Sequence, residues 1–275
     1  MIELAPHNKL GLALTSPLIA GSGAVGYADA WPAGIESALF GAIITSPISW
    51  RPRRGRSGAR HAELPGGFLL ATGDHNPGCR RVLQDHDGAW RRLGIPVIVA
   101  LAASAPEDWE RLAGILDEES GAAGLELHLP HIAHRSDAAA WIGAVRRATT
   151  LPLLVKLPTA RAVALASTCA SAGADALVIG SAPMAAGLTA DGALVEGPVA
   201  GPAAFPFSLY GLRAVAALEL GLPLIAAGGI CRTEDAELCF AAGAAAVQVR
   251  SLLWTDPAAA ARLAETVRGR VTSDQ

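Results

Sequence analysis

The chain has 275 residues, of which 51% are hydrophobic and 17% are charged, a balance that excludes general disorder. Its formal net charge is −3, from 22 basic and 25 acidic residues, so no overall positive field favours nucleic acid or an acidic membrane as a partner. The longest uncharged run, between Lys9 and Asp29, is interrupted by glycine, proline and serine and predicts no membrane span. The first residues, MIELAPHNK, do not resemble a signal peptide, so we expect a cytoplasmic protein.

Short apolar segments alternate with longer helical patterns after an expected N-terminal hairpin from Ile2 to Leu14. Eight segments are short and largely apolar, which is typical of parallel strands buried on both faces. They are Leu18–Ala20, Ala42–Thr45, Val97–Ala100, Gly124–Leu127, Leu153–Lys156, Ala176–Ile179, Leu224–Ala227 and Ala245–Val249. Helices are expected near Val82 and over residues 105–118, 136–148, 161–172, 208–220, 233–241 and 258–271.

These repeated units predict an α/β fold, a (β/α)₈ barrel that forms one domain over residues 1–275. A doubly wound open sheet is the alternative, and GSGAVG at 21–26 matches its G-x-G-x-x-G motif, but that match alone is weak. Residues 46–78 and 180–207 break the rhythm, and in a barrel we expect them as long loops at the C-terminal mouth, where chemistry takes place.

Several polar residues follow the predicted strands. Lys156 ends an apolar strand, where its charge is costly unless it points toward an anion or a cofactor at the mouth. AAGGI at 226–230 and VRS at 249–251 follow the last two strands, the usual place of a phosphate site in barrels, although simple turn glycines would read the same way.

The segment after the fourth strand carries His128, His131 and His134. A general base is one interpretation and ordinary loop histidines are another. We find no convincing carboxylate partner near them in sequence and predict no metal site. RPRRGRSGAR at 51–60 is either a solvated loop or a lid that binds an acidic substrate or partner, and GDHNPG at 73–78 is either a tight turn or a polar wall of the pocket. The four cysteines form no C-x-x-C pair and are interpreted as buried free thiols.

Nine pieces in order resemble the dihydroorotate dehydrogenase family of FMN-bearing barrels over nearly the whole chain. They are SPLIAGSG (16–23), GAIITSPIS (41–49), RRGRSGAR (53–60), GGFLLATGDHNPG (66–78), LELHLPH (125–131), LLVKLP (153–158), GPVAGPA (197–203), AAGGI (226–230) and AGAAAVQVRS (242–251). The resemblance implies an oxidoreductase with bound FMN that acts on a small molecule by proton abstraction and hydride transfer to the flavin.

The flavin side matches the family, with Lys156 near the reactive end of the ring. The residues in the family's FMN-contacting positions are Gly21, Ser22, Thr45, Asn76, Lys156, Gly201, Gly228, Gly229 and Ser251, and we add Ser46, His128 and Arg250 to the candidate cofactor site. Arg250 replaces the family's phosphate-binding glycine and either adds a charge contact or blocks the site.

The substrate side departs from the family. By the resemblance, the family carries a lysine at the position of Ser46 and asparagines at the positions of Leu70, His128 and Gly180. This chain lacks these polar groups, which bind the substrate in the family, so we expect its substrate to differ from dihydroorotate. The position of the family's base holds His131, which we predict to take that role. There are two alternatives. One is a flavin-free lyase, isomerase or synthase acting on a phosphorylated metabolite, and the other is a non-catalytic flavin-binding relative. The chain is also a candidate homodimer.

Overall fold

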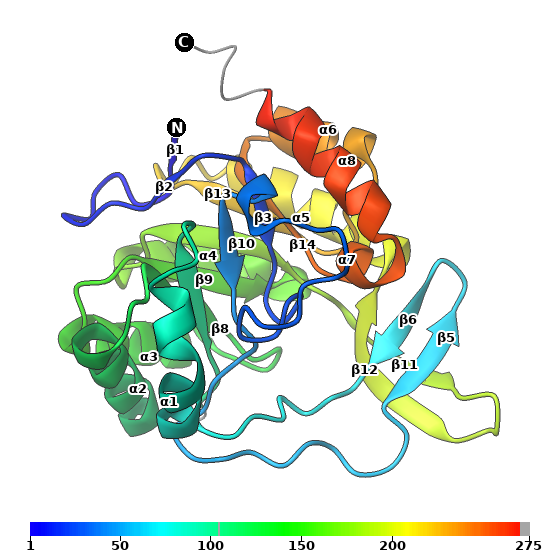
Figure 1. Ribbon diagram of the computed structural model, residues 1–275, viewed down its shortest axis with the longest axis horizontal. Coiled ribbons are helices and arrows are strands. Elements are labelled where there is room, and N and C mark those ends of the chain that lie inside the picture. Colours follow the sequence, from blue (N-terminus) through cyan, green and yellow to red (C-terminus); the bar gives the residue numbers. More distant parts are fainter. Residues whose placement is uncertain (104, 270–275) are drawn as a thin grey trace.

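The computed structural model describes residues 1–103 and 105–269, which form a closed parallel barrel of eight strands (Figure 1). The predicted (β/α)₈ architecture is confirmed, and each of the eight expected strands is present within two residues of its predicted ends. Around the barrel the strands are β3 (Leu18–Ala20), β4 (Ala42–Ile44), β7 (Val97–Leu101), β8 (Gly124–His128), β9 (Leu153–Pro158), β10 (Ala176–Ser181), β13 (Leu224–Ala227) and β14 (Ala244–Val249).

Helices cover the outside of the barrel. They are α1 (Cys79–Trp90), α2 (Pro106–Glu119), α3 (Arg135–Ala148), α4 (Ala162–Ser171), α5 (Phe205–Ala216), α6 (Thr233–Ala241), α7 (Ser251–Thr255) and α8 (Pro257–Arg268). All the expected helices are present, whereas the short α7 was not predicted; the end of the predicted last helix, 270–271, lies outside the described residues. Asp256 starts α8 by accepting a hydrogen bond from the backbone of Ala259 at 2.9 Å, just before Pro257. None of the helices in the described ranges has the length and apolarity to cross a membrane.

The predicted N-terminal hairpin is confirmed as β1 (Ile2–Glu3) paired antiparallel with β2 (Ala13–Leu14). Leu4, Leu12 and Leu14 pack into one buried cluster with residues of the barrel interior, such as Ile19 and Ala246. The hairpin therefore closes the N-terminal end of the barrel with apolar side chains.

The long segments at the mouth contain more structure than expected. Strands β5 (His61–Leu64), β6 (Gly67–Leu70), β11 (Met184–Leu188) and β12 (Leu194–Ala200) form a separate four-stranded antiparallel sheet. Figure 1 shows it to one side of the barrel, with the cyan and yellow-green strands brought together. The two long segments lie at the mouth, as expected, but the sequence did not predict their strands, because β12 pairs with β6 across more than a hundred residues of chain. We call this unit the outer sheet.

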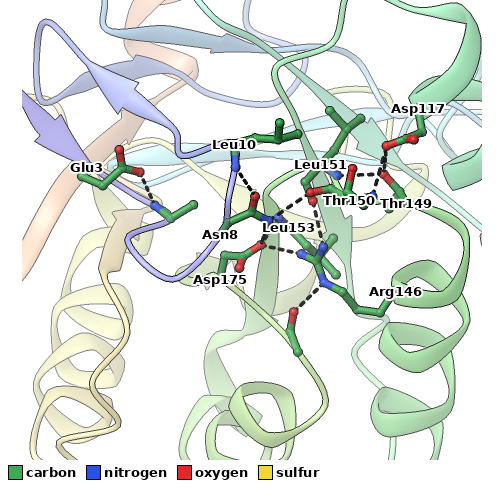
Figure 2. Close-up of polar contacts among 12 residues, drawn as sticks. Glu3, Asn8, Leu10, Asp117, Arg146, Thr149, Thr150, Leu151, Leu153 and Asp175 are labelled. Carbon is green, nitrogen blue, oxygen red and sulfur yellow. Dashed lines mark hydrogen bonds and ion pairs between the residues drawn. The ribbon is translucent and has the colours of Figure 1, made fainter.

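Polar side chains join the N-terminal ends of β9 and β10 to the N-terminal segment (Figure 2). Asp175 accepts hydrogen bonds from the guanidinium of Arg146, from the backbone of Leu153 at 2.7 Å and from the Asn8 amide at 3.2 Å. Arg146 also donates to the carbonyl of Leu151 at 2.9 Å. This end of the barrel lies opposite the mouth, so the network contributes to stability and not to chemistry.

We predict that Asp175→Ala lowers the free energy of unfolding by about 2–3 kcal/mol, since three donors lose a charged acceptor in a site that is mostly shielded from water. Urea denaturation measures the loss. Glu110→Ala is the matched control, because the Arg147–Glu110 ion pair is solvent-exposed and should contribute less than about 1 kcal/mol. Equal losses in the two variants would contradict the special role of Asp175.

Candidate active site

A cavity of about 830 Å³ lies at the C-terminal ends of the barrel strands, with the outer sheet forming part of its wall. Most of the predicted site residues line it, although they come from six strand ends and two loops. These residues are Gly21, Ser22, Ser46, His128, His131, Lys156, Gly201, Gly228, Gly229, Arg250 and Ser251. The C-terminal ends of the strands converge here, which is the usual position of the active site in this fold.

Two predicted cofactor residues lie behind the cavity wall. Thr45 is fully buried, its Oγ1 accepts a hydrogen bond from the backbone of Ala100, and its carbonyl accepts one from the Ser22 hydroxyl at 3.0 Å. Asn76 is also buried, and its Oδ1 accepts hydrogen bonds from the backbone N–H groups of Ser49 and Gly78. Both side chains hold the wall in place and do not line the cavity.

A layer of polar side chains separates the cavity from the apolar interior of the barrel. Glu126 has no exposed surface, and its carboxylate accepts a hydrogen bond from Gln248 Nε2 at 2.6 Å. Lys156 Nζ lies 3.4 Å from Glu126 Oε1 and donates to Gln248 Oε1 at 2.7 Å. The ring nitrogen Nε2 of His128 lies 2.5 Å from the same Oε1. We call these four residues the polar layer.

The charges of the polar layer depend on one another. Burial by itself raises the pKa of the Glu126 carboxyl, but Lys156, His128 and Gln248 outweigh burial and lower that pKa to about 2. Burial lowers the pKa of Lys156, while the attraction of Glu126 opposes this change and the nearby Arg250 adds to it. Glu126 is thus held as a carboxylate and is the counter-charge of Lys156. The sequence predicted that Lys156 needs such an anion but did not identify Glu126.

Sequence reasoning missed Glu126 and Gln248, and it was wrong that the histidines lack a carboxylate partner. Glu126 and His128 are two residues apart in β8, so their side chains lie on the same face of the strand. That spacing was a usable signal in the sequence. The structure adds that His128 is the register neighbour of Lys156 on β9. Gln248 gave no such signal, since it approaches from β14 across the barrel.

The glycine turn after β13 lines the cavity with backbone atoms. Gly228 and Gly229 have φ values of +91° and +77°, and a Cβ atom on them would lie 2.6 Å from Ser208 Oγ and 2.3 Å from the Phe205 nitrogen. Glycine is therefore required by the packing against α5, and the same packing leaves a wall without side chains.

Arg250 follows β14 and stacks its guanidinium over Trp254 at 5.4 Å from the ring centroid. Burial lowers the pKa of Arg250, and the attraction of Asp74 opposes that change. The side chain therefore lies within the electrostatic reach of both Asp74 and Lys156 and lines the cavity. His131, on the loop after β8, also lines the cavity, and burial lowers its pKa.

Other sequence interpretations have simpler outcomes. Cys79, Cys169 and Cys239 are buried free thiols, as expected, and Cys231 is partly buried. Burial raises the pKa of the Cys79 thiol to about 11, which makes it a poor nucleophile. Within residues 1–103 and 105–269 no group of three or more histidine, cysteine or acidic side chains is arranged to hold a metal ion.

A family model described as dihydroorotate dehydrogenase matches residues 5–270. The chain belongs to the dihydroorotate dehydrogenase family. It is 34% identical to the "Dihydroorotate dehydrogenase B (NAD(+)), catalytic subunit" of Pelobacter propionicus, covering 94% of this chain and 90% of that protein. A protein of the same name from Desulforudis audaxviator is 33% identical, covering 95% of this chain and 91% of its own length.

Membership in the dihydroorotate dehydrogenase family confirms the resemblance found in the nine sequence pieces. It does not support the expectation that the substrate differs from dihydroorotate, because the relatives carry that substrate in their names. The roles of individual site residues stay predictions. The contacts within the polar layer indicate which substitutions test them.

We predict that Lys156→Ala lowers the free energy of unfolding at pH 7 by about 3 kcal/mol or more, because it leaves the fully buried Glu126 without its cation. If Lys156 acted only on bound ligands at the mouth, the same substitution would leave the free energy of unfolding unchanged. The double variant Lys156→Met/Glu126→Gln should recover most of the loss, because it removes both charges. Urea denaturation compares them, and a double variant no more stable than Lys156→Ala would contradict the ion pair.

Acid provides a second measurement on the same pair. The carboxyl pKa of Glu126 is depressed in the fold, so its stabilisation is present above the unfolded pKa of about 4.3 and is lost as the pH falls toward about 2. Glu126→Gln should therefore be less stable than wild type at pH 7 and lose less stability between these two pH values.

Proposed function

We propose that this chain is an FMN-dependent oxidoreductase that removes two hydrogens across a CH–CH bond of a small-molecule substrate. Family membership supports the reaction class. The observation that carries the proposal is the buried polar layer, which holds the cation of Lys156 at the floor of a cavity walled by glycine turns. The experiment that tests it is reconstitution with FMN, followed by reduction with substrate.

The residues present fit FMN. A cavity of about 830 Å³ is within the usual range for a cofactor together with a small substrate. Gly21, Gly228 and Gly229 offer a wall without side chains, and Arg250 with Ser251 offers a charge and a hydroxyl for a phosphate. When bound, FMN supplies the acceptor for a hydride from the substrate carbon.

Lys156 is fixed by two partners, so its ammonium occupies one position at the cavity floor. A cation held there stabilises negative charge that develops beside it, without reorganisation during the reaction. Glu126 and Gln248 are positioning residues in this scheme, because they act through Lys156.

His131 is the proposed general base. It lines the cavity, and burial lowers its pKa, which favours the neutral ring able to accept a proton. His131 would accept the proton that leaves one substrate carbon, and the neighbouring carbon would need the hydride acceptor that bound FMN would supply, so that a carbon–carbon double bond could form. His128, whose Nε2 is engaged by Glu126, presents the rest of its ring to the same cavity.

The relatives are named as catalytic subunits of an NAD(+) enzyme. We therefore propose that this chain also works with a partner subunit that passes electrons onward. A homodimer stays a prediction, and sedimentation of the purified chain with and without candidate partners tests both arrangements.

We predict that the chain binds FMN and that two variants shift the potential of bound FMN in opposite directions. Lys156→Met should lower the potential, because the reduced anionic ring loses a cation, whereas Glu126→Gln should raise it by leaving the charge of Lys156 uncompensated. A redox titration of each reconstituted variant measures the shift. Protein that binds no FMN would remove the flavin proposal and favour a flavin-free barrel enzyme, and shifts of the same sign would place Lys156 away from the flavin.

On the substrate, we predict that kcat/KM for dihydroorotate falls below about 10⁴ M⁻¹s⁻¹, the lower end of the ordinary range. Ser46, Leu70, His128 and Gly180 all line the cavity in place of amide and ammonium groups. Gly180 cannot accept a side chain without rearrangement, because a Cβ atom there would lie 1.7 Å from the Ala227 carbonyl oxygen. Steady-state kinetics with an artificial electron acceptor decides, and ordinary turnover would show that the substrate named for the relatives is retained.

A further inference from the structure

Three arginines of the 51–60 segment line the cavity, and two do not. Arg53, Arg56 and Arg60 belong to its wall, and we call them the rim arginines. Arg51 and Arg54 lie outside the wall. The four arginines other than Arg53 are all exposed, so Arg56 and Arg60 differ from Arg51 and Arg54 in lining the cavity and not in burial.

Backbone hydrogen bonds hold the segment that carries the rim arginines. The segment runs beside residues 71–76, so it is held as part of the wall and is not a free loop. The bonds are Arg53 N to Asn76 O at 2.9 Å, Asn76 N to Arg53 O at 3.1 Å, Arg56 N to Thr72 O at 3.0 Å and Ala71 N to Arg60 O at 2.8 Å. A backbone that is already held reduces the conformational entropy that the segment loses when its arginines bind an anion.

The charges at the cavity do not balance within the protein. Lys156 is offset by Glu126, and Arg53 lies 3.4 Å from Asp74. Arg56 donates to the backbone carbonyl of Glu196 at 2.7 Å, which orients the guanidinium. Glu196 also lines the cavity, but its carboxylate is not the group that Arg56 contacts. Across the described residues no ion pair within 4.0 Å engages Arg56 or Arg60.

We propose that Arg56 and Arg60 bind an anionic group of the substrate, a carboxylate or a phosphate, and that this contact determines specificity. A planar guanidinium matches the two oxygens of either group. The inference rests on the proposed function, because it assigns the substrate to the cavity of the polar layer. It also gives the site a means of recognition at a wall where Leu70 offers no hydrogen bond to a ring.

The rest of the cavity indicates that the anionic group belongs to the substrate and not to the cofactor. A cofactor phosphate has Arg250 and Ser251 available after β14, whereas the rim arginines belong to the wall that joins the outer sheet. A chain with a net charge of −3 thus concentrates positive charge at one opening, which attracts an anionic substrate.

Calorimetry with the FMN-reconstituted chain tests the proposal through two matched pairs of probes. Orotate and uracil differ by a carboxylate, and uridine 5′-monophosphate and uridine differ by a phosphate. We expect the anionic member of at least one pair to bind about tenfold more tightly or better. The pair that shows the difference identifies the anionic group.

The variants locate the effect. Arg56→Ala/Arg60→Ala should abolish the preference for the anion, and Arg54→Ala, the matched control, should retain it. Arg60→Ala keeps the contact of Arg56 with Glu196 and should lose at least part of the preference, which guards against a folding defect in the double variant. A thermal melt accompanies each variant.

Several outcomes would overturn the inference. They are no preference for either anion, an equal loss in Arg54→Ala, or a double variant that loses FMN and keeps the preference for the anionic probe. If the wild-type chain binds no FMN yet prefers the anion through Arg56 and Arg60, the proposed redox function fails and this inference stands.

Discussion

Glu126 places a carboxylate with no exposed surface at the top of an apolar barrel, and the organisation of the site follows from the need to satisfy it. Its donors come from three strands: Lys156 on β9, Gln248 on β14 and His128 on β8 itself. An unpaired carboxylate there would be strongly destabilising, so the three strand ends are tied to one position. The cation at the cavity floor is therefore as rigid as the barrel that carries it.

The two ends of the barrel have different tasks. At the N-terminal end, the hairpin packs leucines into the interior, and Asp175 joins the starts of neighbouring strands through ordinary structural contacts. At the C-terminal end, polar groups are buried at a cost and face a cavity. Substitutions at Asp175 should change stability alone, whereas substitutions at Lys156 should change stability and chemistry together.

The outer sheet extends the mouth of the barrel into a deeper cavity. It brings the segment of the rim arginines to the same space as Lys156, although the two are about a hundred residues apart in the chain. The charges at the floor and at the rim differ in their partners. Lys156 at the floor is paired with Glu126, whereas Arg56 and Arg60 at the rim have no acidic partner within 4.0 Å among the described residues.

The sequence by itself determined the barrel, because each buried parallel strand is a short, largely apolar run that local pattern reveals, as Leu18–Ala20 and Leu224–Ala227 show. It also located Lys156, the glycine turns and His131 at strand ends and loops, since their positions follow from the αβ repeat. Only the tertiary structure decided that β12 pairs with β6, that Gln248 reaches Glu126 across the barrel, and that Arg56 and Arg60 face the cavity while Arg54 does not. The physical reason is the same in each case: these contacts join residues far apart in the chain or depend on which side of a segment faces inward, and local pattern carries neither kind of information.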